Sequence, residues 1–392
     1  MNSPFDPAIN AEETIGLLCD LIAIDSVNPS LVPGGAGEGE IARYVADYLS
    51  HLGLEVRHWE VAPGRPNVVG RLKGSGGGKT LMLNCHMDTV SVEGMDEPFQ
   101  ARRVNGKIYG RGALDIKGGL AAVLTAVKAV VESGVTLTGD LLVAAVADEE
   151  YASLGTESLT KEYRADGAIV MEPTDLRLGV AHKGFVWLEV QTFGKAAHGS
   201  RPAEGVDAIM KMGLFLARLA ELEQRLWSGP GHPLLGPGSL HASIIEGGRE
   251  LSTYPDHCRL QIERRTVPGE TVEGVAQEVR EIMADLEKSD SDFKATSRVT
   301  FVREPWEASP DQEIIQVLRQ AIAAQSGQEP SYTVHSAWMD SALLGAAGIS
   351  TVVFGPGGEG AHALEEYVRA DEVVACADIL ARTIVDFCVL VQ

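Results

Sequence analysis

The chain has 392 residues but few cysteines, and no two of them form a CxxC pair. The five cysteines are odd in number and scattered, which argues against a disulfide framework and favours a reducing compartment. No apolar run approaches the roughly 18 residues that a membrane span needs. The first ten residues, MNSPFDPAIN, lack the basic and apolar regions of a signal peptide. We therefore expect a cytoplasmic protein with no membrane partner.

Basic residues are also scarce. There are 33 Lys and Arg against 55 Asp and Glu, so the formal net charge is −22. A nucleic acid or an anionic membrane needs a basic surface, and neither is an expected partner. The hydrophobic fraction of 45% and the charged fraction of 22% are those of a globular protein rather than a disordered one. The length predicts two domains.

Short apolar runs without alternation indicate strands that are buried on both faces, as in a parallel sheet. Such runs are Thr80–Cys85, Leu141–Ala147, Ala168–Met171 and Ile349–Phe354. Helical patterns lie between them, the clearest at Gly118–Glu132, where apolar residues recur every three or four positions. The alternation of strands and helices predicts an α/β fold with a central, mostly parallel sheet flanked by helices.

The middle of the chain has a different pattern. Apolar and polar residues alternate in Phe185–Thr192 and His257–Glu263, which is typical of an antiparallel sheet with one wet face. Long helical patterns occupy Gly205–Trp227 and Thr271–Glu287. We predict an inserted α+β domain over residues 183–302, and a discontinuous first domain made of 1–182 and 303–392.

Polar side chains follow the predicted strands where each strand ends. They are His86 and Asp88, the Asp148–Glu150 acids, Glu172, and His362 after a glycine-rich turn. Asp115 lies in a further glycine-rich segment, Gly110–Gly119. Taken singly, each has an ordinary explanation, such as a surface hydrogen bond for His86 or a helix cap for Asp115.

Together these residues point to divalent cations, because ligands gather at the carboxyl ends of strands in open α/β sheets. Mixed nitrogen and oxygen ligands without thiolate suit zinc, or manganese and cobalt less selectively, whereas calcium prefers oxygen alone. The candidates exceed what one tetrahedral zinc needs, but they suffice for two ions that share a bridging carboxylate.

These motifs resemble those of a known family, the co-catalytic zinc hydrolases that include acetylornithine deacetylase, succinyl-diaminopimelate desuccinylase, aminoacylase and the glutamate carboxypeptidases. The resemblance spans essentially the whole chain. It rests on NCHMDTV (Asn84–Val90), GRGALDIKGG (Gly110–Gly119), DEE (Asp148–Glu150), MEPT (Met171–Thr174), KAAHGSRPAEGVDA (Lys195–Ala208) and GPGGEGAHALEEYV (Gly355–Val368).

The resemblance implies a zinc-exopeptidase-like catalytic domain with two Zn²⁺ ions per subunit, for which Co²⁺ or Mn²⁺ would be able to substitute. One ion would be held by His86, Asp115 and Glu172, and the other by Asp115, Glu150 and His362, with Asp115 bridging. Asp88 would orient His86, and Glu149 would be the general base. The family also implies a cis peptide between Asp115 and Ile116.

The inserted domain would be a lid and dimerisation module, making the protein a homodimer. His198 would reach the partner subunit's active site and polarise the scissile carbonyl. Arg265 would bind the substrate carboxylate, together with Ser252, which stands where the family often has Asn. Trp338 is either a wall of the acyl pocket or an ordinary core residue.

The expected activity is hydrolysis of the amide bond of an N-acyl amino acid, by a metal-activated water with Glu149 as general base. A carboxypeptidase or dipeptidase on the same site is the first alternative, acting on a short peptide. A non-catalytic homologue that binds amino-acid derivatives is the second, although every ligand position is filled by a competent residue.

Overall fold

A computed structural model describes residues 5–389 of the chain. The first four residues, on which the expectation of no signal peptide partly rests, lie outside the described residues. Within 5–389 the structure contains no helix that is both long and apolar enough to cross a membrane.

The chain divides into two compact units. The first consists of the residues up to Val180, then Ala308–Thr333, and then the residues from Met339 onward, while the second consists of Ala181–Glu307 and Val334–Trp338. The structure therefore places 181–182, 303–307 and 334–338 with the second unit, where the sequence had suggested the first. The reason is local pairing: Trp306 pairs with His182, and the Lys183 N–H donates to the His335 carbonyl.

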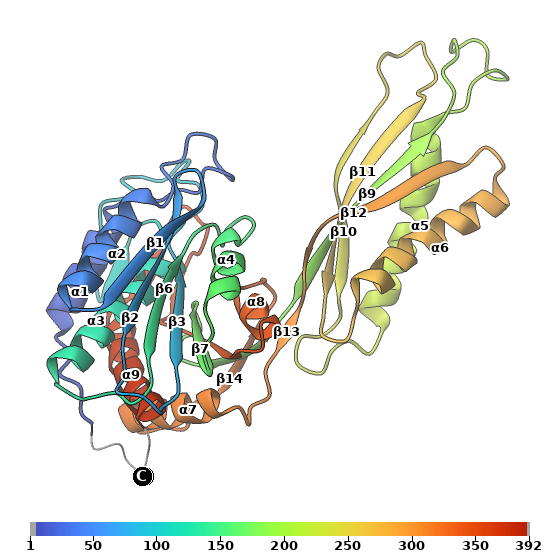
Figure 1. The fold of residues 1–392 in the computed structure, drawn as a ribbon. Helices are drawn as coiled ribbons and strands as arrows, with labels where there is room; N and C mark the ends of the chain where they lie inside the picture. Colours follow the sequence, from blue (N-terminus) through green and yellow to red (C-terminus); the bar gives the residue numbers. More distant parts are fainter. Residues whose placement is uncertain (1–4, 390–392) are drawn as a thin grey trace. The chain divides into compact units, whose positions relative to one another are not determined.

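The largest sheet, most of whose strands belong to the first unit, combines parallel and antiparallel strands (Figure 1). Its order is β1 (Glu55–Ala62), β2 (Arg65–Leu72), β6 (Leu141–Val146), β3 (Leu81–His86), β7 (Gly167–Met171), β15 (Ser350–Phe354), β8 (Leu178–His182) and β13 (Trp306–Glu307), and β14 (Tyr332–His335) pairs with β8. The four strands in the middle of this order are parallel to one another. The α/β class is confirmed, but the sheet as a whole is mixed.

The parallel strands are those that the apolar runs predicted. Residues of β3, β6 and β7 are buried along their whole length, and β15 is buried except at its first residue. Helices bury both faces of such strands, so apolar residues are favoured at every position and their sequences do not alternate.

Helices cover both faces of this sheet (Figure 1). One layer contains helices that pack against one another, namely α1 (Ala11–Ile22), α3 (Gly118–Glu132), α7 (Glu313–Ser326) and α9 (Ala370–Cys388). Further helices are α2 (Gly39–His51), which packs on β1 and β2, and α4 (Leu154–Glu162), which packs on α8 (Ser341–Ala346). The helix predicted at Gly118–Glu132 is confirmed as α3.

A small antiparallel sheet completes the first unit. It has the order β16 (Gly358–Glu359), β17 (Tyr367–Arg369), β5 (Lys107–Tyr109) and β4 (Arg102–Val104). The short irregular helix η1 (Ala113–Lys117) follows β5 and leads directly into α3.

The second unit is a four-stranded antiparallel sheet with two helices. The strand order is β10 (Ser239–Gly247), β11 (His257–Thr266), β9 (Gly184–Phe193) and β12 (Lys294–Arg303), with α5 (Ala208–Ser228) and α6 (Val272–Ser289). Alternate residues of β9 and β11 join a core with both helices, including Val186, Leu188, Ile262, Phe215 and Val279. The two alternating segments and two helical patterns of the sequence are thus confirmed.

Candidate metal centre

The parallel strands bring the predicted ligands to one edge of the sheet. His86 is the last residue of β3 and pairs in register with Val146, which ends β6. Glu149 and Glu150 follow β6, and Glu172 follows β7. Because neighbouring parallel strands end together, these side chains meet although they are distant in sequence.

Five side chains form two overlapping groups of three. The first group is His86, Asp115 and Glu172, and the second is Asp115, Glu150 and His362. Asp115 belongs to both and presents a different oxygen to each: Oδ1 lies 3.1 Å from His86 Nε2, and Oδ2 lies 3.3 Å from His362 Nε2. His86 Nε2 is also 3.7 Å from Glu172, and His362 Nε2 is 3.1 Å from Glu150.

These distances fit a divalent cation in each group. Nitrogen and oxygen ligands bound tetrahedrally at about 2.0–2.2 Å from zinc lie roughly 3.4 Å from each other. The observed separations of 3.1–3.7 Å bracket that value. In addition, Glu150 Oε1 is buried and has no hydrogen-bond partner among residues 5–389, as expected of an oxygen that awaits an ion.

Burial and neighbouring groups shift the pKa values of the acids and histidines in the centre. Burial raises the pKa of Glu150 to about 7, and burial next to Asp115 raises the pKa of Glu172 well above its usual value. Hydrogen bonds to Asp115 and Glu150 raise the pKa of His362 to about 10. A divalent cation bound among these groups would favour the ionised acids and the neutral imidazoles.

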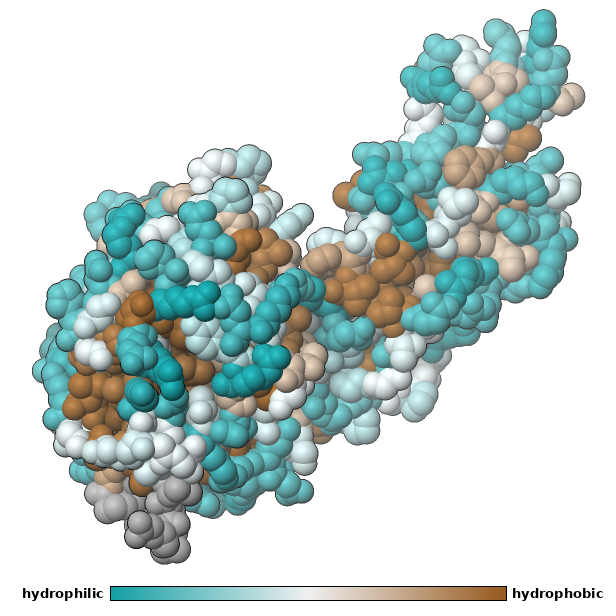
Figure 2. Space-filling model, in the orientation of Figure 1, coloured by the Kyte–Doolittle hydropathy of each residue, from teal (hydrophilic) through white to brown (hydrophobic). Residues whose placement is uncertain are grey.

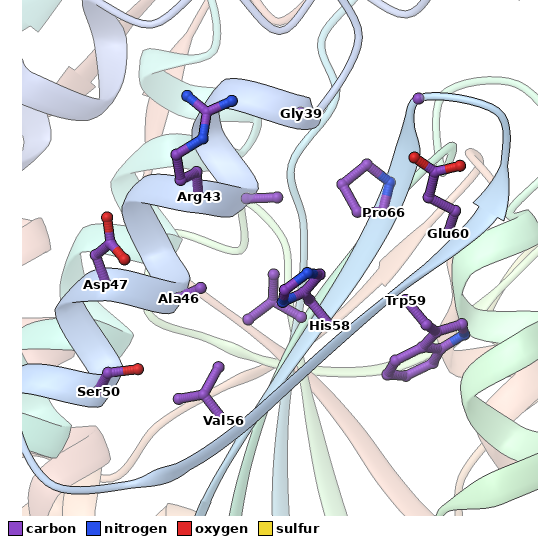
Figure 3. Close-up of a pocket in the computed structure, with 13 residues that line it drawn as sticks. Gly39, Arg43, Ala46, Asp47, Ser50, Val56, His58, Trp59, Glu60 and Pro66 are labelled. Carbon is purple, nitrogen blue, oxygen red and sulfur yellow. The ribbon is translucent and has the colours of Figure 1, made fainter.

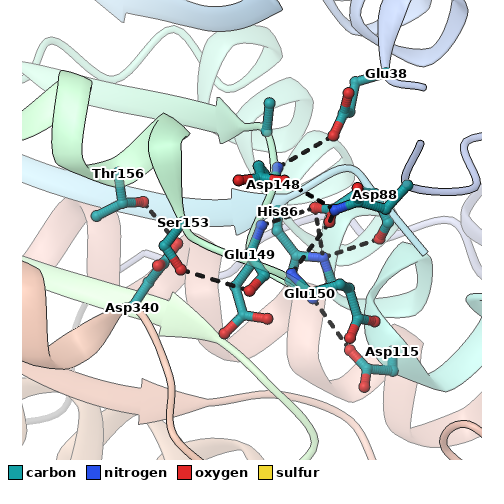
Figure 4. A network of polar contacts seen from close by, with 12 residues as sticks. Glu38, His86, Asp88, Asp115, Asp148, Glu149, Glu150, Ser153, Thr156 and Asp340 are labelled. Carbon is teal, nitrogen blue, oxygen red and sulfur yellow. Dashed lines mark hydrogen bonds and ion pairs between the residues drawn. The ribbon is translucent and has the colours of Figure 1, made fainter. Parts of the chain in front are cut away.

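Asp88 contacts His86 less directly than predicted. Its carboxylate Oδ1 is 3.5 Å from His86 Nδ1, whereas its backbone carbonyl is 3.0 Å from that nitrogen. The carboxylate instead accepts hydrogen bonds from the backbone N–H groups of Glu149 and Glu150, both at 3.1 Å. Asp88 therefore holds the turn that carries the two glutamates as well as the histidine (Figure 4).

Glu149 differs from Glu150 in its surroundings. Its backbone is fixed by Asp88, but within residues 5–389 no hydrogen bond or ion pair engages its carboxylate. Burial, and next the charge of Glu172, raise the pKa of Glu149 well above its usual value. A carboxyl group that is held at its base and unpaired at its tip is suited to accepting and releasing a proton.

Asp115 is fixed by a buried acid that the sequence reasoning did not single out. The Glu366 carboxylate accepts from the backbone N–H groups of Gly112 (3.1 Å), Leu114 (2.9 Å) and Asp115 (3.1 Å), and Arg111 pairs with it at 2.7 Å. The predicted cis peptide between Asp115 and Ile116 is present. Glu366 lies within the EEYV end of a motif already noted, so the sequence did contain a signal for it.

The second unit contains the remaining candidates, at two ends of its sheet. His198 and Ser252 are exposed and lie in adjoining loops. The Gly199 N–H donates to the Ser252 carbonyl at 2.7 Å, and the backbones of His198 and Thr253 form an isolated antiparallel β-bridge. Arg265 lies at the far end of β11, roughly 27 Å along the strand from its first residue, His257. One subunit therefore does not bring His198 and Arg265 together.

Arg265 and Trp338 are both half-buried. Arg265 donates through Nε to Glu263 at 2.6 Å and stacks 5.2 Å from the Phe185 ring. Trp338 belongs to the second unit, where its indole N–H donates to the Glu304 carbonyl at 3.0 Å.

A separate groove lies between α2 and the β1–β2 hairpin (Figure 3). Its volume is about 760 Å³, and charged residues such as Arg43, Asp47 and Glu60 line it beside Val56 and Val68. None of the predicted site residues lines this groove, so it is separate from the candidate metal centre.

Comparison with known proteins identifies the family. The model of peptidase family M20/M25/M40 matches residues 82–386, which contain all five predicted ligands. An N-formyl-4-amino-5-aminomethyl-2-methylpyrimidine deformylase from Bacillus subtilis is 32% identical, over 96% of this chain and 95% of the relative. An acetylornithine deacetylase from Myxococcus xanthus is 31% identical, over 95% of this chain and 96% of the relative.

Solved structures share the fold over nearly the whole chain. An aminopeptidase from Bacillus cereus superposes with a TM-score of 0.79 at 21% identity, covering 97% of this chain and 99% of its own. A dinuclear metal-binding peptidase from Bacillus subtilis gives a TM-score of 0.75 at 15% identity, covering 96% and 98%. With the family model and the full-length relatives, these matches confirm the resemblance: the chain belongs to peptidase family M20/M25/M40 and is a metal-dependent enzyme that hydrolyses amide bonds.

Proposed function

We propose that this enzyme holds two zinc ions and cleaves the amide bond of an N-acyl amino acid. His86, Asp115 and Glu172 would bind one ion, and Asp115, Glu150 and His362 the other. The observation that carries the proposal is the orientation of Asp115, whose two carboxylate oxygens face two different histidines at 3.1 and 3.3 Å. Cobalt or manganese would be alternative ions.

The ions would supply Lewis-acid polarisation of the amide carbonyl and lower the pKa of a coordinated water. Glu149 would accept the proton of the attacking water and deliver it to the leaving amine. The contact with Asp88 supports this role. Asp88 Oδ1 accepts a hydrogen bond from the Glu149 backbone N–H at 3.1 Å, while the Glu149 carboxylate has no partner among residues 5–389. His198 of a partner subunit would stabilise the developing oxyanion.

The relatives support a short acyl group as the part removed, because those described above are named a deformylase and a deacetylase. Arg265 would bind the substrate carboxylate through its guanidinium fork. Ser252, which stands where the family often has Asn, would lie near Arg265 only if it came from a second subunit. The carboxypeptidase or dipeptidase alternative uses the same ions and differs in the pocket alone.

A homodimer formed through the second unit is part of this proposal. β10 is an edge strand, and its Ile244 and Ile245 are 53% and 52% exposed. On α5, Met210 and Leu214 are also exposed, and apolar surface is visible on this unit (Figure 2). An unpaired strand edge bearing apolar side chains favours pairing with a second copy. A cytoplasmic location completes the proposal, supported by five unpaired cysteines.

Metal removal tests the chemistry. Dialysis against a strong chelator should abolish hydrolysis by orders of magnitude, and Zn²⁺ or Co²⁺ should restore it, because no residue replaces the Lewis acid. Elemental analysis before and after dialysis measures the stoichiometry. Full activity in protein shown to be metal-free would overturn the proposal.

A substrate panel tests the specificity. N-formyl, N-acetyl and N-succinyl amino acids and unmodified dipeptides would be compared by kcat/KM on the zinc-loaded enzyme. The proposal expects an N-acyl amino acid with a free carboxylate to be the best substrate. A preference for dipeptides would instead establish the peptidase alternative.

A further inference from the structure

A buried network of charged groups lies behind the metal centre and has no part in the ligand set. Glu38, Asp88 and Asp148 are fully buried carboxylates, and Asn28 and Arg65 lie among them at 0% and 5% exposure. Arg65 is the one cation that pairs with Glu38 or Asp148 among residues 5–389. Burying several acids is costly unless a positive group compensates them.

Arg65 uses its whole guanidinium fork in this network. Nε and Nη2 pair with the two oxygens of Glu38, Nη2 also reaches Asp148 Oδ1 at 3.0 Å, and Nη1 donates to Ser30 Oγ at 3.1 Å. A lysine ammonium is a point charge and could not satisfy these acceptors from one position.

Asp148 connects this fork to the turn that bears the glutamates. It has a left-handed backbone with φ of +72°, a conformation that is unfavourable for most non-glycine residues. Its N–H donates to Glu38 at 3.1 Å, and its carboxylate accepts from Arg65 and from Asn28 at 3.1 Å. The ion pair therefore holds in place the residue that turns the chain after β6.

Asn28 carries the connection onward to the centre. Its side-chain amide donates to Asp148 at 3.1 Å and to Asp88 at 2.7 Å. Asp88 in turn holds the backbone N–H groups of Glu149 and Glu150 and lies beside His86. The contacts form an unbroken path from Arg65 to a ligand and to the general base.

We propose that Arg65 is a positioning residue for catalysis, which clamps Asp148 and thereby aims Glu149 and Glu150 at the metal centre. This inference rests on the proposed function, since it concerns the same site. It assigns to Arg65, which touches neither ion nor substrate, an effect on metal affinity and on kcat rather than on KM.

Arg65→Lys and Arg65→Met test the proposal, with Arg71→Met as the matched control. Arg71 lies on the same strand and also pairs with an acid, Asp140 at 2.6 Å, but its side chain is 41% exposed. Metal-free protein would be titrated with Co²⁺ and followed by visible absorption, which reports affinity and ligand geometry without turnover. Kinetics of the zinc-loaded enzymes and thermal melts would be measured in parallel.

We expect both Arg65 variants to lose about 10- to 100-fold in Co²⁺ affinity and in kcat, as removal of outer supports to a metal site does, with KM changed less than about threefold. Lys should be the milder change. The Co²⁺ spectrum should also shift, which a mere loss of stability would not produce. Arg71→Met should stay within about twofold of the parent.

Several results would overturn the assignment. One is Co²⁺ binding and kcat within about twofold of the parent for Arg65→Lys and Arg65→Met. Another is a fall in melting temperature alone, with an unchanged spectrum. Should Arg65→Met fail to fold, Arg65→Lys decides by the same criteria. If the parent enzyme itself bound no Co²⁺, the metal centre would be wrong, which is a different outcome from normal binding by parent and variants alike.

Discussion

Glu149 and Glu150 are neighbours in the chain, yet their carboxylates meet different surroundings. Glu150 faces His362 at 3.1 Å, in a group with Asp115, whereas Glu149 has no partner for its carboxylate among residues 5–389. Asp88 accepts a hydrogen bond from the N–H of each, so one carboxylate fixes the backbone of both. At the scale of the residue, the two proposed roles, general base and metal ligand, fall on adjacent positions of the backbone.

Glu149→Gln tests this separation. The amide cannot take a proton, so kcat should fall by about 10²- to 10⁴-fold, while metal content stays that of the parent. Steady-state kinetics and elemental analysis measure the two quantities. The control is Glu162→Gln, an exposed acid on α4 that pairs with Arg57 at the surface. A variant with substantial turnover would remove Glu149 from the role of base.

The proposed ligands and Asp88 could be predicted from the sequence, but Asn28 and Arg65, which lie behind them, could not. His86, Glu150 and Glu172 each follow an apolar run that marks a strand, so pattern and chemistry coincide there. Asn28 and Arg65 come from segments with no such pattern, and the contacts they make with Asp88 and Asp148 span 60 to 120 positions. Only the folded chain shows that Arg65 faces Asp148.

At the scale of the element, the two faces of the sheet in the second unit differ. One face packs on α5 and α6, and the other carries polar side chains that form hydrogen bonds with one another. Glu189 on β9 lies at the centre of the latter face and is 3% exposed. It accepts hydrogen bonds from Arg259 on β11 at 2.7 Å, from Arg298 on β12 at 2.9 Å and from Gln191 on β9 itself at 2.7 Å. These contacts join three strands. The hydrogen bond from Arg298, and then that from Gln191, lower the pKa of Glu189 to about 2.

This pKa predicts how the stability of the sheet depends on pH. A lowered folded-state pKa stabilises the fold above the unfolded value of 4.5, and the contribution is lost as the pH falls from there toward about 2. Glu189→Gln should therefore lower the melting temperature by a few degrees at pH 7, and the difference from the parent should shrink below pH 4.

Thermal melts at pH 7, 4 and 3 measure this dependence, with Glu246→Gln as control. Glu246 is also near Arg259, at 3.5 Å, but its side chain is 67% exposed. Such surface pairs contribute little. A difference between parent and Glu189→Gln that is equal at all three pH values would contradict the assigned pKa.

Elements were predictable where burial is uniform or strictly alternating. β3, β6 and β7 are fully buried, and β9 and β11 alternate, so their sequences carry the signal. β1 is partly or fully exposed at every position, and most of β10 is exposed. These strands form because a neighbour supplies hydrogen bonds, which no local pattern of hydrophobicity reports.

At the scale of the whole molecule, the proposed dimer links assembly to activity. The proposed dimer makes each active site depend on His198 of the other subunit. Ile244→Asp with Ile245→Asp places charges on the exposed edge strand β10 and should yield monomers with strongly reduced kcat. Analytical ultracentrifugation and kinetics measure both effects.

Val299→Asp is the control for this pair. Val299 is 36% exposed and lies on β12, at the opposite edge of the same sheet. It should leave the sedimentation coefficient and kcat unchanged. Monomers that keep full activity would exclude a contribution of His198 in trans, and dimers that persist in the double variant would place the interface elsewhere.

The interruption of the first unit by the second bears on the order in which a ribosome delivers the parts. β15, which pairs with β7, and the loop that carries His362 are synthesised only after Ala181–Glu307. At usual elongation rates this delay is on the order of seconds, and domains tend to fold as units while they emerge. The antiparallel sheet of the second unit can thus form while the nascent first unit still lacks β15, the helices α7, α8 and α9, and His362. If His362 is a ligand as proposed, the metal centre is completed only after that segment leaves the exit tunnel.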